Sequence, residues 1–288
     1  MKPPPFSYHD PGTVEEAVGL LGSLENAKLL AGGQSLMPML NMRFVLPDHV
    51  IDLNRVSGLS GIAEANGGLR IGGMTRQREV EYSDVVRRGC PLLAEAILQV
   101  GHRQTRNRGT VGGSLAHLDP SAEIPAVCAA VDAVVTVRGP RGERSIPFSG
   151  FPAGYMTPAM ALDELLVSVH LPSWRPGHGY GFEEFARRHG DFAIVSAAAL
   201  LEAEGGRIAR ASVTVSGVGP APVRLSETEA ALAGAAGSED LFRAACESAR
   251  RIEALEDVHA PASYRQHLAA VLARRALVKA WSRIGAAG

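Results

Sequence analysis

The sequence predicts an α+β protein with two domains, and three observations along its 288 residues lead to this prediction. Helical and strand patterns alternate in the first part of the chain, which is typical of α/β units. Proline and glycine then concentrate around residues 173–179, which marks a linker. Three strand patterns follow in succession, with helices after them, as in an α+β domain. We expect a first domain over 1–175, with subdomains at about 1–57 and 58–175, and a second domain over 176–288.

The composition excludes several classes of partner. Apolar residues make up 46% of the chain and charged residues 20%, and the formal net charge is -1. This balance gives no electrostatic reason to expect nucleic acid or an anionic membrane surface as partner. The N-terminus carries no secretory pattern, and no apolar run approaches the ~20 residues that span a bilayer.

The cysteines limit the redox chemistry that the chain can carry. Cys90, Cys128 and Cys246 are an odd and scattered set, which predicts reduced thiols in the cytoplasm. Iron–sulfur and zinc sites need grouped ligands, so we expect neither to be made by this chain alone. A redox role would require an organic cofactor, or metal centres on another chain.

The first subdomain is predicted to contain a helix, a strand, a glycine turn and a second strand. Thr13 and Glu16 have the spacing of a capping box and precede apolar residues at helical spacing. Residues 28–31 predict a buried strand. Residues 49–53 predict the next strand, with Asp52 as a cap at its end.

The second subdomain is predicted to combine a buried sheet with helices. Residues 69–72, 133–138 and 165–171 have the β-branched and leucine content of strands. Residues 82–100 are helical in composition, and residues 101–113 resemble a polar loop interrupted by glycines.

The C-terminal domain is predicted to hold a three-stranded antiparallel sheet and helices. The strand patterns cover residues 180–187, 192–202 and 207–217. Ser226 and Glu229 have the spacing of another capping box, and residues 264–281 predict a final amphipathic helix.

Two glycine pairs carry the chemistry that the sequence predicts. They lie in residues 30–36, here called the first loop, and in residues 110–114, the second loop. Paired glycines admit positive φ and a close approach of a ligand. Consecutive free N–H groups form a nest for phosphate oxygens, and side chains such as Gln34 and Ser114 add neutral donors. Each hydrogen bond to a charged acceptor would contribute about 1.5–3 kcal/mol.

Each loop also has a purely structural interpretation, because a glycine pair after a strand is usually only a turn. Two such loops with amide and hydroxyl neighbours favour a ligand site moderately. The chain has no G-x-G-x-x-G after a strand and no G-x-x-x-x-G-K-[ST], so neither a Rossmann site nor a P-loop is supported.

Four segments resemble the FAD-binding medium subunits of the molybdenum hydroxylase family, of the carbon monoxide, nicotine, quinoline and xanthine dehydrogenase type. The first loop resembles the family's first flavin motif, and the second loop, continued by residues 116–123, resembles the second. Residues 187–193 resemble a third segment, and residues 264–265 and 274–277 resemble the closing helix. The resemblance covers nearly the whole chain, and the four segments occur in the same order as in the family.

The resemblance implies a flavin fold of the PCMH/VAO type, in which FAD lies between two α/β subdomains under the C-terminal domain. Both loops would hold the pyrophosphate and the adjoining ribityl chain. Asp119 or Glu123 would accept hydrogen bonds from ribityl or ribose hydroxyls, and the backbone of Leu166 or Val167 would contact the polar edge of the ring. The cofactor-binding residues predicted in this way are Leu30, Ala31, Gly32, Gly33, Gln34, Ser35, Leu36, Val100, Thr110, Val111, Gly112, Gly113, Ser114, Asp119, Glu123, Leu166, Val167 and Phe192.

Two positions depart from the family pattern. Phe192 would lie against the isoalloxazine, where many relatives have Tyr or Ile, and it has no hydroxyl to donate. Many relatives carry Lys where this chain has Glu184, which puts a lysine–flavin contact in doubt. Asp119 precedes Pro120 and is alternatively a turn residue.

The resemblance also implies an electron relay with no catalytic residue on this chain. A large subunit would carry molybdopterin, a small subunit two [2Fe–2S] clusters, and FAD on this chain would pass electrons to an external acceptor, in a dimer of heterotrimers. One alternative is a stand-alone FAD-dependent oxidase or reductase of the same fold. The other is a non-catalytic protein whose glycine loops are turns. The sequence reveals neither the substrate of the partner subunit nor the acceptor.

Overall fold

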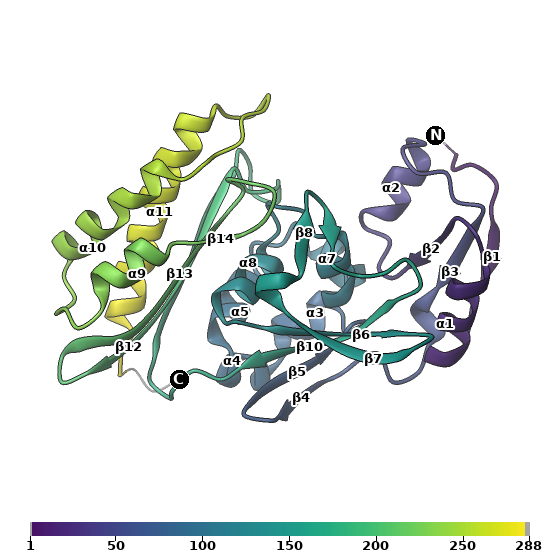
Figure 1. The fold of residues 1–288 in the computed structure, drawn as a ribbon, viewed down its shortest axis with the longest axis horizontal. Coiled ribbons are helices and arrows are strands. Elements are labelled where there is room, and N and C mark those ends of the chain that lie inside the picture. Colours follow the sequence, from purple (N-terminus) through teal and green to yellow (C-terminus); the bar gives the residue numbers. More distant parts are fainter. Residues whose placement is uncertain (1, 286–288) are drawn as a thin grey trace.

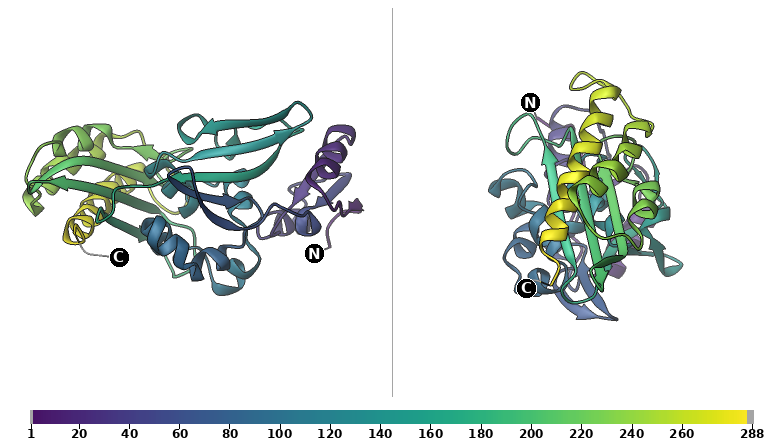
Figure 2. Two further views of the ribbon diagram at one scale, coloured as in Figure 1. Left: turned by 90° about the horizontal axis from the view of Figure 1, so that it is seen from below. Right: turned by 90° about the vertical axis from the view of Figure 1, so that its left-hand side faces the viewer.

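The computed structural model describes residues 2–285 and shows two larger sheets with a layer of helices between them (Figure 1). A small parallel sheet near the N-terminus lies at one end of the elongated molecule. The C-terminal helices lie at the other end (Figure 2).

The N-terminal unit is a three-stranded parallel sheet with short helices beside it. Its elements are β1 (Ser7–His9), α1 (Val14–Ser23), β2 (Ala27–Leu30), α2 (Leu36–Asn41), β3 (His49–Asp52) and the 3-10 turn η1 (Leu53–Arg55). The strand order is β1-β3-β2. The Thr13 hydroxyl accepts from the N–H of Glu16, as predicted, but the Glu16 carboxylate accepts from Gly12 and not from Thr13. Asp52 caps η1, as predicted, by accepting from the N–H of Asn54.

The middle of the chain forms a five-stranded antiparallel sheet in the order β4-β5-β10-β6-β7. Its strands are β4 (Ile62–Ala65), β5 (Gly68–Gly72), β6 (Val134–Gly139), β7 (Gly142–Pro147) and β10 (Leu165–Pro172). The helices are α3 (Gln77–Tyr82), α4 (Asp84–Gly89), α5 (Pro91–Ala96), α6 (Arg103–Arg108), α7 (Val111–His117) and α8 (Glu123–Ala130), and the short elements are η2 (Phe148–Gly150), β8 (Pro152–Gly154) and β9 (Thr157–Pro158).

Two predictions for this region are wrong in detail. The helical segment over residues 82–100 is broken, because α4 ends at Gly89 and Pro91 starts α5 at a position where its missing N–H costs nothing. The polar segment over residues 101–113 is not a loop throughout, since it contains α6 and the start of α7.

The C-terminal portion confirms the three predicted strands and adds a fourth. The elements are β11 (Gly179–Phe185), β12 (Val195–Glu204), β13 (Arg207–Ser216), β14 (Val223–Arg224), α9 (Ser226–Leu232), α10 (Glu239–Cys246), η3 (Glu247–Arg251) and α11 (Ala262–Ser282). The antiparallel sheet has the order β11-β12-β13-β14. The predicted capping box at Ser226 is wrong, because the Glu229 carboxylate accepts from Val213 and Arg224 instead.

Strand β12 is apolar on both faces because each face belongs to a different core. Ala198 and Leu200 join the core that includes helices α5, α7 and α8, while Ala197 and Ala199 join the core under α11. A strand buried on both sides appears in sequence as a continuous apolar run. A backbone hydrogen bond also joins the C-terminal sheet to the segment before α8, since the N–H of Gly217 donates to Pro120 O at 2.9 Å.

Arg265 of α11 is buried and ties together the ends of β12 and β13. Its guanidinium donates to the carbonyl oxygens of Ile194 and Gly217, each at 2.6 Å, and to the carboxylate of Asp257 at 2.7 Å. The strand ends that border the loop before β12 are therefore fixed from the face that α11 covers.

We expect Arg265→Ala to lower the free energy of unfolding by about 3 kcal/mol, because two buried carbonyl oxygens lose their donor. Arg275→Ala is the matched control on the exposed side of the same helix, and should change stability by less than about 0.5 kcal/mol. Urea denaturation of both variants measures the difference. An equal loss of stability in both variants would contradict the role given to the Arg265 hydrogen bonds.

Candidate functional site

The two glycine loops lie against each other. A Cβ placed on Gly32 would lie 2.2 Å from the carbonyl oxygen of Arg108, just before the second loop. A Cβ placed on Gly113 would lie 2.7 Å from Thr110 Oγ1 and 3.6 Å from the Ala31 Cβ. Glycine is therefore required at position 32 by close backbone approach, whereas a side chain at position 113 would crowd the Thr110 hydroxyl.

The first loop presents a run of open amide groups. Leu30 ends β2, Leu36 begins α2, and Gly33 between them has a left-handed φ of 73°. Among the described residues, the backbone N–H groups of residues 32–35 donate to no protein acceptor. The Gln34 side chain turns back to donate to Gly32 O at 3.2 Å. The loop thus has the open amides predicted for an anion site.

The second loop does not have the free amides that were predicted. Thr110 is the N-cap of α7 and its hydroxyl accepts from Gly113 at 3.0 Å, so the glycine pair is the first turn of a helix. The N–H of Val111 donates to Thr75 O, and the N–H of Gly112 donates to Gly73 O at 2.8 Å. These hydrogen bonds use acceptors within the protein, so the amides of the second loop are not free for a ligand and the loop is tightly packed.

Two residues that the sequence did not single out join the loops. The Asn54 side chain donates to Ala31 O at 3.0 Å, and its own oxygen accepts from Arg76. Arg76 also donates to the carbonyl oxygen of Arg108. Burial lowers the pKa of Arg76, and the charge of Arg108 lowers it further. Only their positions in the sequence could have pointed to these two residues. Asn54 closely follows the end of a strand, and Arg76 closely follows the Gly72-Gly73 pair.

Arg106 anchors the segment that leads into the second loop. It donates to the carbonyl oxygen of Val100, a predicted site residue, at 3.0 Å. Its Nε donates to the Glu81 carboxylate at 2.9 Å, with the two side chains only 10% and 11% exposed. This hydrogen bond holds the pKa of Glu81 below its ordinary value.

Leu166 and Val167 contact Gly73, which in turn contacts the second loop. The register of β10 against β6 shifts between Leu166 and Ser168, so Val167 is the extra residue of a bulge. Val167 O accepts from Gly73 at 2.8 Å, and Gly73 in turn touches Gly112. The bulge therefore packs against Gly73, and Gly73 packs against the second loop.

The predicted carboxylates differ in their surroundings. Asp119 accepts from the N–H of Ser121 at 2.8 Å, as a turn residue does, and is half-buried. Glu123 is buried at the start of α8, and burial raises its pKa to about 7. Burial and the neighbouring Glu123 also raise the pKa of Glu184 to about 8. His117 is half-buried, and desolvation lowers its pKa.

Phe192 lies in the connection between β11 and β12 and is 61% exposed, so it is not part of the strand predicted to begin there. The same connection touches the first part of the chain, because His189 lies edge-on to His102 with ring centroids 5.9 Å apart. Gly190 packs directly on the His102 ring. Phe192 is therefore available to a ligand that reaches this connection.

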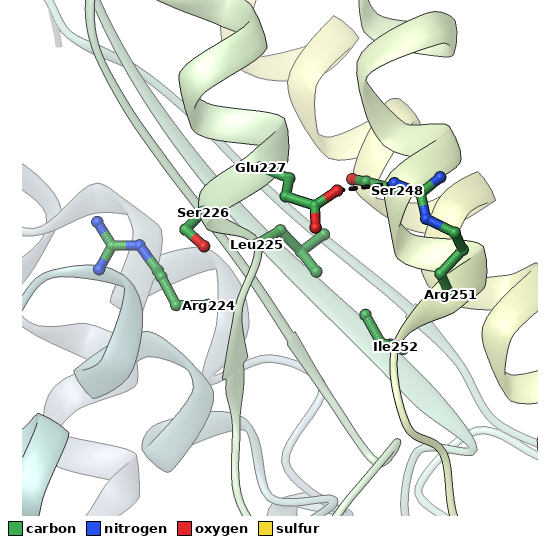
Figure 3. Close-up of a pocket in the computed structure, with 7 residues that line it drawn as sticks. All are labelled: Arg224, Leu225, Ser226, Glu227, Ser248, Arg251 and Ile252. Atoms are coloured by element: carbon green, nitrogen blue, oxygen red, sulfur yellow. Dashed lines mark hydrogen bonds and ion pairs between the residues drawn. The ribbon is translucent and has the colours of Figure 1, made fainter.

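A separate hollow lies in the C-terminal portion, away from both loops (Figure 3). Its two arginines are already paired, Arg251 with Glu227 at 2.7 Å and Arg224 with Glu229. A second hollow lies over the five-stranded sheet and includes Arg70 and His170. Neither contains a residue of the two glycine loops.

Across residues 2–285, no helix is long and apolar enough to cross a membrane. Within the same range, no group of three or more His, Cys, Asp or Glu residues is placed to hold a metal ion.

Comparison with known proteins gives matches over nearly the whole chain. Residues 4–174 match the family "FAD binding domain in molybdopterin dehydrogenase", and residues 180–280 match "CO dehydrogenase flavoprotein C-terminal domain". The chain is 40% identical to the 6-hydroxypseudooxynicotine dehydrogenase complex subunit alpha of Paenarthrobacter nicotinovorans, over 98% of this chain and 97% of that protein. It is similar in structure to carbon monoxide dehydrogenase from Hydrogenophaga pseudoflava, with TM-score 0.96, 39% identity, and coverage of 99% of this chain and 100% of that chain.

We expect Glu81→Gln to lower the free energy of unfolding by about 3 kcal/mol at pH 7, because buried Arg106 loses its counter-charge. The folded-state pKa of Glu81 is depressed, so its stabilising contribution is present above the ordinary value of 4.5 and lost as pH falls below it. The deficit of the variant should therefore shrink on acidification. Denaturation at several pH values, with exposed Glu64→Gln as control, measures this, and a deficit independent of pH would contradict it.

Proposed function

The chain belongs to the family of FAD-binding medium subunits of molybdenum hydroxylases, and we propose that its two glycine loops form the cofactor site. It is an oxidoreductase subunit that binds FAD and relays electrons. The fold is the FAD-binding domain and C-terminal domain of this family. We place the domain boundary at residues 175–176, within the irregular segment between β10 and β11.

The open amides of residues 32–35 carry the proposal for the pyrophosphate. Four adjacent N–H groups for which the described residues offer no acceptor suit the oxygens of a diphosphate. The charge of Arg76 is bonded to Asn54 and to the carbonyl oxygen of Arg108, the atom that lies against Gly32. The sequence predicted backbone dipoles and neutral side-chain donors as the only ligands of the pyrophosphate. Arg76 adds a positive charge to this proposed site.

The remaining residues are assigned by position around these amides. The second loop limits the space next to Ala31, and its Ser114 side chain adds a hydroxyl. Asp119 or Glu123 would accept from ribityl or ribose hydroxyls. The bulge at Leu166 and Val167 would meet the ring edge, and exposed Phe192 would cover the ring.

When bound, FAD supplies a centre that accepts electrons singly and delivers them in pairs. The residues of this chain bind it, orient it and limit its contact with water. We propose that the electrons come from [2Fe–2S] clusters on a small subunit, that a large subunit carries molybdopterin, and that the assembly is a dimer of heterotrimers. Support comes from relatives named as subunits of dehydrogenases and hydroxylases, such as the nicotine 6-hydroxylase medium subunit of Paenarthrobacter nicotinovorans. We assign the chain to the cytoplasm because its three cysteines are free and buried.

We expect Gly33→Ala to weaken FAD binding at least tenfold. Alanine disfavours the left-handed φ of 73° by about 1–2 kcal/mol, so the loop changes conformation and its open amides are displaced. Gly58→Ala is the matched control, because Gly58 has a similar φ of 77° in a turn outside both loops, with open space around it. Fluorescence titration of FAD measures both affinities. Equal effects of the two substitutions would refute the assignment.

We expect the chain, purified from its native host, to bring two further subunits with it, together with iron and molybdenum. Metal analysis and an absorbance spectrum of the purified material test this. A yellow single chain that oxidises a substrate without partners would instead support the stand-alone oxidase or reductase.

A further inference from the structure

A polar hollow lies on the open face of the five-stranded sheet, and we call it the sheet hollow. It is defined by Arg70, His170 and the hydroxyl residues Thr136, Ser145 and Ser168. Its volume is about 290 Å³, close to the lower limit of about 300 Å³ that is usual for small-molecule sites. No residue of its lining belongs to the cofactor site proposed above, so the hollow is a separate feature of the chain.

The strand register places the two basic residues of the hollow side by side. Arg70 of β5 lies directly opposite His170 of β10. Directly opposed residues point to the same face, with Cβ atoms about 5 Å apart. The His170 ring extends over β5, because a Cβ placed on Gly68 would lie 2.8 Å from its Cε1. Glycine at position 68 therefore leaves room for the imidazole on the side where Arg70 lies.

A row of small residues borders this basic pair. Ser168 lies opposite Gly72 on one side and opposite Thr136 on the other, and Thr136 lies opposite Ser145. The row is two positions along the strands from the basic pair, so it shares the same face. Small side chains leave the space above this row unfilled, which explains why a hollow forms next to the two long basic side chains.

The hollow has a rigid floor and a wall at one end. On the other face of the sheet, Ile71 and Val169 are at most 1% exposed and belong to the core packed against the helices. On the face of the hollow, the backbone of Leu59 covers Gly72, because a Cβ placed there would lie 2.3 Å from Leu59 O. Ser168 lies next to this wall and is only 4% exposed, so its hydroxyl belongs to the floor.

The positive charge of the hollow is not neutralised by the chain. Two other arginines on strands of this sheet are ion-paired, Arg138 with Glu143 at 3.4 Å and Arg144 with Glu164 at 2.7 Å. Within residues 2–285, Arg70 forms no ion pair and no carboxylate lines the hollow. The guanidinium group presents a planar fork of N–H donors that matches two oxygens of an anionic group.

We propose that the sheet hollow binds a small phosphate monoester. The guanidinium of Arg70 binds two phosphate oxygens, and the hydroxyls of Ser168 and Thr136 and one ring N–H of the adjacent imidazole donate to the phosphate. A carboxylate has only two oxygens in one plane, so it would use the guanidinium and leave the hydroxyl donors unused.

The extent of the lining favours an ester over the bare phosphate ion. The lining crosses four neighbouring strands, which is about 14 Å from β5 to β7. The phosphate donors lie toward β5 and β10, whereas Ser145 lies on β7 and Val134 provides an apolar contact on β6. The alcohol part of the ester therefore occupies the end of the hollow near β7.

Amide chemical-shift mapping of the full chain, saturated with FAD, tests the proposal with glycerol 3-phosphate as the probe. FAD fills the cofactor site, so the probe reports on the sheet hollow. At constant ionic strength we expect saturable shifts of the amides of Thr136, Ser168 and His170, with a Kd of about 1 mM or tighter. Acetate should bind at least about tenfold more weakly, because it loses the hydrogen bonds from the hydroxyls.

Arg70→Gln should weaken binding of glycerol 3-phosphate by about tenfold or more, because the charge-assisted hydrogen bonds are lost. Arg138→Gln is the matched control. Arg138 is two positions from Thr136 on β6 and shares its face, but it is already paired with Glu143, so its replacement should change the Kd by less than about twofold. Thr136→Val keeps the shape of the side chain, removes one donor, and should weaken binding independently of any charge effect.

Three results would overturn the proposal. They are the absence of saturable shifts at Thr136, Ser168 and His170, an equal loss of affinity in Arg70→Gln and Arg138→Gln, and binding of acetate as tight as that of the ester. FAD affinity is measured on the same samples and should be the same in Arg70→Gln and wild type. A chain that does not bind FAD but shows the shifts at the hollow would contradict the cofactor assignment and support this proposal.

Discussion

The rest of the structure depends on the close contact between the first and second loops. Gly32 allows the first loop to approach the backbone of Arg108 and Gly109 to a distance that any side chain at this position would prevent. Asn54 and Arg76 then fix the pair by hydrogen bonds to both sides. Within residues 2–285, the amides of residues 32–35 have no protein acceptor at this junction, which is why we propose them as the ligands of the pyrophosphate.

The C-terminal sheet completes this arrangement by contributing to two cores. The alternate residues of β12 join the helices of the FAD-binding domain on one side and α11 on the other. The connection that carries Phe192 is therefore attached to a strand fixed on both faces. Such a domain is suited to cover a cofactor, because its position is set by extensive apolar packing and by the bond from Gly217 to Pro120.

The sequence predicted those features whose cause is local. The strands, the final helix and the open first loop follow from residue patterns, and the family resemblance supplied the fold and the cofactor. The internal bonding of the second loop could not be foreseen, because it depends on Thr110 capping α7 and on contacts with Gly73, far away in sequence. Asn54 and Arg76 were missed for the same reason, since both make their hydrogen bonds where distant segments meet.

The backbone amides of the first loop are the proposed ligands of the FAD pyrophosphate. Amide hydrogen exchange of the full chain, resolved to single residues and compared with and without saturating FAD, measures their engagement. We expect exchange to slow strongly at residues 32–35, for which the described residues offer no acceptor in the absence of FAD. Unchanged exchange at these four amides, with protection only elsewhere in the chain, would contradict it.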